Sequence, residues 1–154
     1  MPTGLPVRLS GIDMVRVGAH GRISELWHVE ELGALGLAQR QWAGAEVAHA
    51  SAFGAPGALA ETPPDALLSA GERMRLGVAR RHIEEMWALG RAELADSLYA
   101  PDVVDHNPAP GQRPGIPGIL DALHLLRDAA PDLRLSARAY VADGELVADR
   151  WVMR

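Results

Sequence analysis

Two runs in which apolar and polar residues alternate open the chain, from Leu5 to Val17 and from Arg22 to Val29. A short segment with turn-forming glycines separates them, so the pattern predicts a β-hairpin. Because successive side chains of a strand point to opposite faces, Asp13 should share its face with Gly11 and Val15.

The segment after Val29 predicts less regular structure. Acidic residues begin it, which favours a short helix because carboxylates suit the positive end of a helix dipole, but its glycines weaken that helix. From Ala43 to Pro64 the composition changes to Ala, Gly and Pro with few large apolar residues. We therefore assign residues 44–68 as a linker.

Apolar residues at helical spacing follow the linker. Ser69 and Glu72 have the spacing of a capping box, and an apolar side continues from there to Gly90, which predicts the longest helix of the chain. The sequence then predicts a shorter helix at 92–99, a polar, proline-rich loop at 103–118, and a third helix around 119–126 that ends before Pro131.

Apolar and polar residues alternate again in the last two segments, from Leu133 to Val141 and from Glu145 to Met153. Between them lies Asp143-Gly144, a dipeptide typical of type I′ turns. We predict a second β-hairpin here.

The composition is that of one soluble globular domain. The 154 residues are 48% hydrophobic and 23% charged, which is enough apolar material for a single core. A net charge of -5 gives no electrostatic reason to expect nucleic acid or a membrane as partner. The chain has no cysteine, which excludes disulfides and thiolate chemistry. Its beginning lacks the pattern of a signal peptide, so we expect a cytoplasmic protein.

Several short motifs occur together in the two halves of the chain. The second half contains YAPD, VVDHNP, PDLR and RWVMR, and the first contains PTG, SGIDMVRV and GRISELW. In this combination the chain resembles SnoaL-like polyketide cyclases of the nuclear transport factor 2-like superfamily, with the two halves in reverse order. The resemblance implies an α+β, cone-shaped fold in which a curved mixed β-sheet packs on about three helices around a ligand pocket.

The reversed order implies a circular permutation within one domain that spans residues 1–154. Residues 1–43 correspond to the family's carboxy-terminal half and residues 69–154 to its amino-terminal half, joined through the linker. Such rearrangements succeed where the ends of a domain lie close together. Two other arrangements stay open: a dimer whose partners exchange halves, and a piece cut across two tandem domains. An edge strand at the old connection would suit a homodimer, which we expect.

The resemblance also implies chemistry. Cyclases of this family close a ring by intramolecular aldol condensation without a metal or an organic cofactor, and an aspartate moves the proton. The position of that aspartate falls at or next to His28, and a family histidine falls at Asp13, so the two residue types are exchanged. A carboxylate beside an imidazole sets its tautomer and raises its basicity. We therefore predict His28 as the catalytic general base and Asp13 as the residue that orients it, with no cofactor.

Five residues are candidate substrate contacts: His106, Asn107 and Arg113 in the proline-rich loop, and Trp27 and Trp151 on predicted strands. The family has pocket-mouth residues near this loop, and tryptophans suit the apolar wall that a polycyclic substrate needs. The alternatives are that the tryptophans belong to the core and that the loop residues bond their own backbone.

The six histidines form no i, i+4 pair and no HExxH motif, so we expect no metal site. His82 and His124 lie in predicted helices and should be hydrogen-bonded structural residues.

The leading hypothesis is a cofactor-free cyclase or related lyase that acts on an apolar carbonyl compound. One alternative is a hydrolase that opens epoxides with carboxylate-activated water. The other is a non-catalytic small-molecule-binding module, because one fold carries many functions. Asp13 and His28 side chains that point away from the pocket would favour the binding module.

Overall fold

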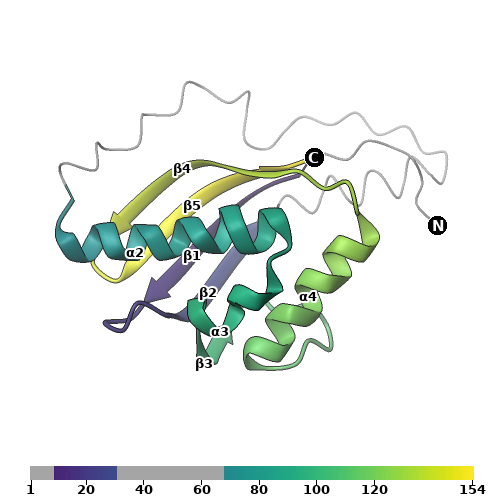
Figure 1. Cartoon of the computed structure of the whole chain (residues 1–154), viewed down its shortest axis with the longest axis horizontal. Coiled ribbons are helices and arrows are strands. Elements are labelled where there is room, and N and C mark those ends of the chain that lie inside the picture. The colour runs from purple at the N-terminus through teal and green to yellow at the C-terminus, as the bar shows by residue number, and fades with distance from the viewer. Residues whose placement is uncertain (1–8, 31–67) are drawn as a thin grey trace.

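The protein folds as a five-stranded sheet with helices on one side (Figure 1). A computed structural model describes residues 9–30 and 68–154. The strands are β1 (Leu9–Val17), β2 (Ile23–Glu30), β3 (Tyr99–Asp105), β4 (Leu135–Asp143) and β5 (Leu146–Met153). Their order across the sheet is β3-β2-β1-β5-β4. Every neighbouring pair is antiparallel except β2 and β3, which run parallel.

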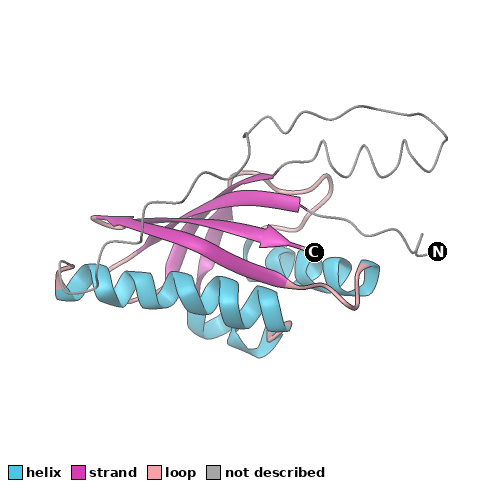
Figure 2. Ribbon diagram, turned by 90° about the horizontal axis from the view of Figure 1, so that it is seen from above, coloured by secondary structure: helices cyan, strands magenta, loops and turns pink. Residues whose placement is uncertain are grey.

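The helices form a second layer against one face of the sheet, as Figure 2 shows from above. They are α2 (Ala70–Arg80), the π-helix η2 (Arg81–Trp87), the 3₁₀ turn η3 (Ala92–Leu94), the short α3 (Ala95–Leu98) and α4 (Gly115–Ala129). The face of the sheet that packs against the helices is the inner face, and the opposite face is the outer face.

The longest predicted helix begins with the predicted capping box. The Ser69 hydroxyl accepts the backbone N–H of Glu72 at 3.2 Å, and the Glu72 carboxylate accepts the backbone N–H of Ser69 at 2.7 Å. α2 passes directly into η2, and Gly90 takes a φ of 71° just beyond it. Glycine tolerates this left-handed conformation, which stops a helix.

The two predicted hairpins belong to one sheet. β1 pairs with β2 on one side and with β5 on the other, and Leu9 lies opposite Met153 at one end of the β1–β5 ladder. Segments from the two extremes of the sequence are therefore neighbours within one chain.

Two local predictions are wrong. Residues 99–105, expected as the end of a helix and part of a loop, form the edge strand β3, where Pro101 is tolerated because one side of an edge strand needs no partner. The final turn lies one residue later than expected, at Gly144 and Glu145. Only Gly144 has a positive φ, whereas a type I′ turn requires two.

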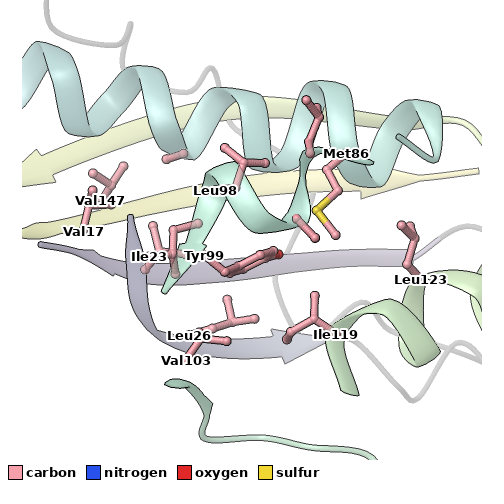
Figure 3. Close-up of a cluster of buried hydrophobic side chains, with 14 of the residues drawn as sticks. Val17, Ile23, Leu26, Met86, Leu98, Tyr99, Val103, Ile119, Leu123 and Val147 are labelled. Carbon is pink, nitrogen blue, oxygen red and sulfur yellow. The ribbon is translucent and has the colours of Figure 1, made fainter. Parts of the chain in front are cut away.

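A hydrophobic core fills the space between the inner face and the helices (Figure 3). The strands contribute Val15, Val17, Ile23, Leu26 and Val147, and the helices contribute Leu76, Met86, Leu98, Ile119 and Leu123. The phenol of Tyr99 is fully buried among them. The predicted short helix after Val29 and nearly all of the predicted linker lie outside the described residues.

Candidate functional site

Three polar residues are buried within the described part of the chain, and they meet on the inner face. Asp13 of β1 lies opposite Asp149 of β5 in the antiparallel register. His82 of η2 approaches from the helix layer, with its Nε2 atom 3.7 Å from Oδ2 of Asp13. These residues, with Tyr99 and Trp151 that bond to them, are called the inner cluster.

Trp151 holds one oxygen of Asp13. Its indole Nε1–H donates to Oδ1 of Asp13 at 2.9 Å. The ring reaches this atom by lying over Gly11, where an added Cβ would be 2.2 Å from Cζ2 of Trp151. The glycine is therefore needed for the hydrogen bond, and the alternation of β1 places both Gly11 and Asp13 on the inner face as predicted.

A chain of hydrogen bonds links Trp87, Tyr99 and His82. Trp87 Nε1 and the Tyr99 hydroxyl are 3.3 Å apart, and that hydroxyl is 2.7 Å from Nδ1 of His82. An indole only donates, so the Tyr99 oxygen accepts from Trp87, and its own O–H is free to donate to Nδ1 of His82. When Tyr99 donates in this way, a neutral His82 carries its proton on Nε2, facing Asp13.

The π-helix places His82 at this position. η2 interrupts a regular α-helix at the turn that contains both His82 and Trp87. Such wide turns occur often at functional sites, because the extra residue re-aims the side chains around it.

Asp149 carries a proton at neutral pH. Burial, followed by the negative charges of Asp13 and Glu84, raises its pKa to about 9. Glu84 is in turn held by the hydroxyl of Tyr140, which donates to it at 2.8 Å. Neither oxygen of Asp149 has a hydrogen-bond partner among the described residues.

His28 also faces inward, because it lies opposite Asp13 in the β1–β2 register. Its ring, however, is held by two other carboxylates: Nε2 is 3.3 Å from Asp105 and Nδ1 is 3.6 Å from Glu30. The contact with Asp105, and then that with Glu30, raises the pKa of His28 to about 10. Asn107 accepts the backbone N–H of His28 at 3.1 Å. These residues form an edge cluster at the β2–β3 side of the sheet.

Two of the predicted substrate contacts lie on the outer face instead. Trp27 lies opposite Met14 in the register, which places it on the other side of the sheet from Asp13. The ring of His106 stacks on Trp27 with centroids 4.5 Å apart, and its Nε2 is 2.9 Å from Glu25. Trp27 and Trp151 therefore do not share a wall.

Arg113, which was also predicted to contact the substrate, forms an ion pair with another residue instead. Its guanidinium donates twice to the carboxylate of Asp121, at 2.6 and 2.7 Å, in an exposed pair at the start of α4. Of the predicted site residues, the structure brings Asp13, Trp151 and His28 to the inner face and places Asn107 beside His28.

Sequence reasoning missed the functional candidates that other elements contribute. His82 is hydrogen-bonded, as predicted for a structural histidine, but it also faces Asp13. Asp149 lies in a strand whose apolar and polar residues alternate, and that alternation places it on the same face as Val147 and Trp151. A buried acid there would have pointed to the site.

The arrangement defines a class of fold. A curved mixed sheet of five strands with helices on its inner face is an α+β fold of the nuclear transport factor 2-like kind. None of the helices in residues 9–30 and 68–154 is long and apolar enough to cross a membrane. In these two stretches no group of three His, Cys, Asp or Glu side chains is arranged so that it could hold a metal ion.

Comparison with known proteins specifies the fold further. Residues 79–154 match the family model of the SnoaL-like domain, which confirms the resemblance for that half of the chain. Among solved structures, the chain is similar to a "Putative polyketide cyclase" from Bacillus cereus ATCC 10987, with a TM-score of 0.52 and 23% sequence identity. The similarity covers 60% of this chain and 62% of that chain. No curated protein matches the chain.

Proposed function

We propose that this protein is a SnoaL-like enzyme that transfers a proton beside the carbonyl group of an apolar small molecule, in a cyclisation of the aldol type, without a cofactor. The observation that carries the proposal is the environment of Asp13. Its carboxylate lies on the inner face between two N–H groups and beside a second acid that is held protonated.

Asp13 is the base in this proposal. Trp151 occupies Oδ1, whereas Oδ2 is 3.7 Å from His82 and beyond hydrogen-bond distance, so its lone pairs are available. In the reaction a C–H bond beside the carbonyl breaks, the proton passes to Oδ2, and the electron pair forms an enolate. The enolate carbon then attacks a second carbonyl of the same molecule, and the new alkoxide takes up a proton.

His28 has the opposite role from the one expected from the sequence. A group whose pKa is about 10 holds its proton at neutral pH, so it donates and does not accept. We assign it as the cationic donor at the edge of the site, with Asp105 and Asn107 as positioning residues. Trp151 remains the proposed apolar contact, and the mechanism makes no use of Trp27, His106 or Arg113.

The test is proton exchange in a simple ketone. Deuterium incorporation beside the carbonyl of 2-tetralone is followed by NMR in heavy water, with the whole chain as catalyst. We expect acceleration by the wild-type chain and a loss of about 100-fold or more in Asp13→Asn, the size of effect typical of general-base catalysis. His106→Ala on the outer face is the control and should keep the wild-type rate. Equal rates for Asp13→Asn and the wild-type chain would refute the assignment.

A further inference from the structure

We propose that Asp149 is the site at which the ligand's oxygen atom binds, with its neutral carboxyl group as the hydrogen-bond donor. The inference rests on the proposed function and specifies the substrate class: an apolar compound whose carbonyl oxygen enters the inner cluster beside Asp13. Nothing in the family resemblance assigns a role to this residue.

The geometry of β5 supports the inference. Asp149 lies opposite Asp13 of β1 on one side and opposite Tyr140 of β4 on the other, so it occupies the middle of the inner face. It is 2% exposed, and both of its oxygens lack a partner among the described residues. A buried polar group in that state costs free energy unless a ligand completes its bonding.

Burial and two neighbouring carboxylates keep Asp149 protonated. Asp13 projects from β1 and Glu84 from η2, and Tyr140 lies opposite Asp149 on β4. His82 of η2 contacts Asp13, and Arg80 of α2 lies over the ring of Tyr140. The two carboxylates oppose a third negative charge, and burial acts in the same direction. The carboxyl group therefore retains the O–H that a carbonyl oxygen requires.

The chemistry of the proposed reaction uses such a donor. When Asp13 removes a proton from carbon, negative charge moves to the carbonyl oxygen of the ligand. A neutral O–H group already in place stabilises that charge without giving up its proton, and its effect is large where water is excluded. Asp149 and Asp13 are neighbours across the strands, so one ligand can contact both.

The experiment measures binding of 2-naphthol, a planar apolar compound with a single oxygen, by titration calorimetry on the whole chain. Asp149→Asn keeps a neutral donor, and Asp149→Leu removes it while it keeps the branch at Cγ. We expect saturable binding to the wild-type chain, binding within about threefold for Asp149→Asn, and a loss of about tenfold or more for Asp149→Leu, which corresponds to about 1.4 kcal/mol. Asp128→Leu, on the exposed side of α4, is the matched control and should bind as the wild-type chain does.

Denaturation by urea separates binding from folding. Asp149→Leu should be at least as stable as the wild-type chain, because it replaces a buried polar group without a partner by an apolar one. Undiminished binding of 2-naphthol by Asp149→Leu would overturn the inference, as would the absence of saturable binding to the wild-type chain.

A spectroscopic measurement covers the case in which Asp149→Leu fails to fold. Infrared difference spectra at neutral pH should contain the C=O stretch of a protonated carboxyl group that shifts when 2-naphthol binds and is missing in Asp149→Asn. The same band in both chains would contradict the inference. If Asp13→Asn keeps full exchange activity while these results hold, the base assignment is wrong and the oxygen site stands. If Asp13→Asn loses its exchange activity while Asp149→Leu still binds 2-naphthol as the wild-type chain does, the base assignment stands and the oxygen site is wrong.

Discussion

Asp105, on the neighbouring strand β3, determines the charge of His28. It reaches the ring at 3.3 Å, although Asp13 is the residue opposite His28 in the register. Burial is the largest single influence on the pKa of Asp105 and would raise it, but the contact with His28 and the hydrogen bonds from Asn107 and Gln112 together lower that pKa. The two groups therefore stabilise each other as an ion pair across the β2–β3 edge.

Removal of this partner should be visible in the titration of His28. In Asp105→Asn we expect the pKa of His28 to fall from about 10 toward its ordinary value of 6.5, with Glu30 as the remaining partner. NMR titration of the imidazole protons measures it. Asp121→Asn, which breaks an exposed ion pair at the start of α4, is the control and should leave His28 unchanged.

The same ion pair gives the stability a pH dependence. The pKa of His28 is higher in the folded state than in the unfolded chain, so its contribution is complete below pH 6.5 and is lost as pH rises through about 10. For Asp105 the folded pKa is lowered, so its contribution is present above its ordinary value of 3.8 and is lost as pH falls. A pKa near 6.5 for His28 in the wild-type chain would contradict this description.

Individual residues of the site were only partly predictable from sequence. The period of β1 placed Asp13 inward beside Gly11, because alternation is a local property. The partners of Asp13 come from β5 and η2, more than 60 positions away, and local patterns carry no information about such contacts. The stacking of Trp27 on His106 is likewise a tertiary contact that no local pattern indicates.

Among the elements, the β1–β5 ladder depends on a close approach of side chain to backbone. Gly11 admits the Trp151 ring, and any larger residue would collide with it. Glycine weakens a strand and often marks a position where another group approaches the backbone closely. The sequence therefore indicates that something packs on Gly11, but it does not identify Trp151 as the partner.

Gly11→Ala should destabilise the fold by about 1–3 kcal/mol, the usual cost of overpacking, because the indole has to leave its position over β1. The same change should break the Trp151–Asp13 hydrogen bond. Urea denaturation measures the stability, and the Trp151 indole N–H signal in NMR reports the bond.

Gly77→Ala is the matched control for this substitution. An added Cβ at position 77 of α2 meets no atom within 4 Å, so alanine should stabilise the helix by about 0.5–1 kcal/mol. If Gly11→Ala were as stable as Gly77→Ala, the proposed packing of Trp151 would be wrong.

Two elements escaped prediction for different physical reasons. β3 contains Pro101 and few alternating residues, and it forms because the edge of β2 accepts a parallel partner. η2 has the apolar spacing of an ordinary helix, and a single wide turn changes that period too little to be read from the sequence.

In the molecule as a whole, the opening and closing hairpins form one curved wall. Hydrophobic patterns by themselves do not say which strands are neighbours, whereas the permutation that the family resemblance implies would place these two hairpins side by side, as β1 and β5 are. The circular permutation remains a proposal. It is supported by the adjacency of Leu9 and Met153 and by a family match that starts at residue 79 and leaves the first hairpin out.

A rejoined chain tests the permutation. Residues 69–154 followed directly by residues 1–43 would restore the family's order and remove the segment 44–68. We expect this chain to fold with the same strand pairing, since eight residues would separate Arg154 from Leu9 and a β-hairpin needs fewer. Backbone NMR contacts between β1 and β5 provide the measurement. A rejoined chain that is unfolded, or that lacks these contacts, would count against a permuted domain.

The location of the chemistry on the inner face can be tested with the tryptophan side chains. Trp151 belongs to the inner cluster and Trp87 bonds to its Tyr99, whereas Trp27 lies on the outer face. When 2-tetralone is added to chain labelled with ¹⁵N in its indoles, the Nε1–H signals of Trp151 and Trp87 should shift in a saturable way, and that of Trp27 should stay in place. A shift at Trp27 with none at Trp151 would place the ligand on the wrong side of the sheet and contradict the proposed site.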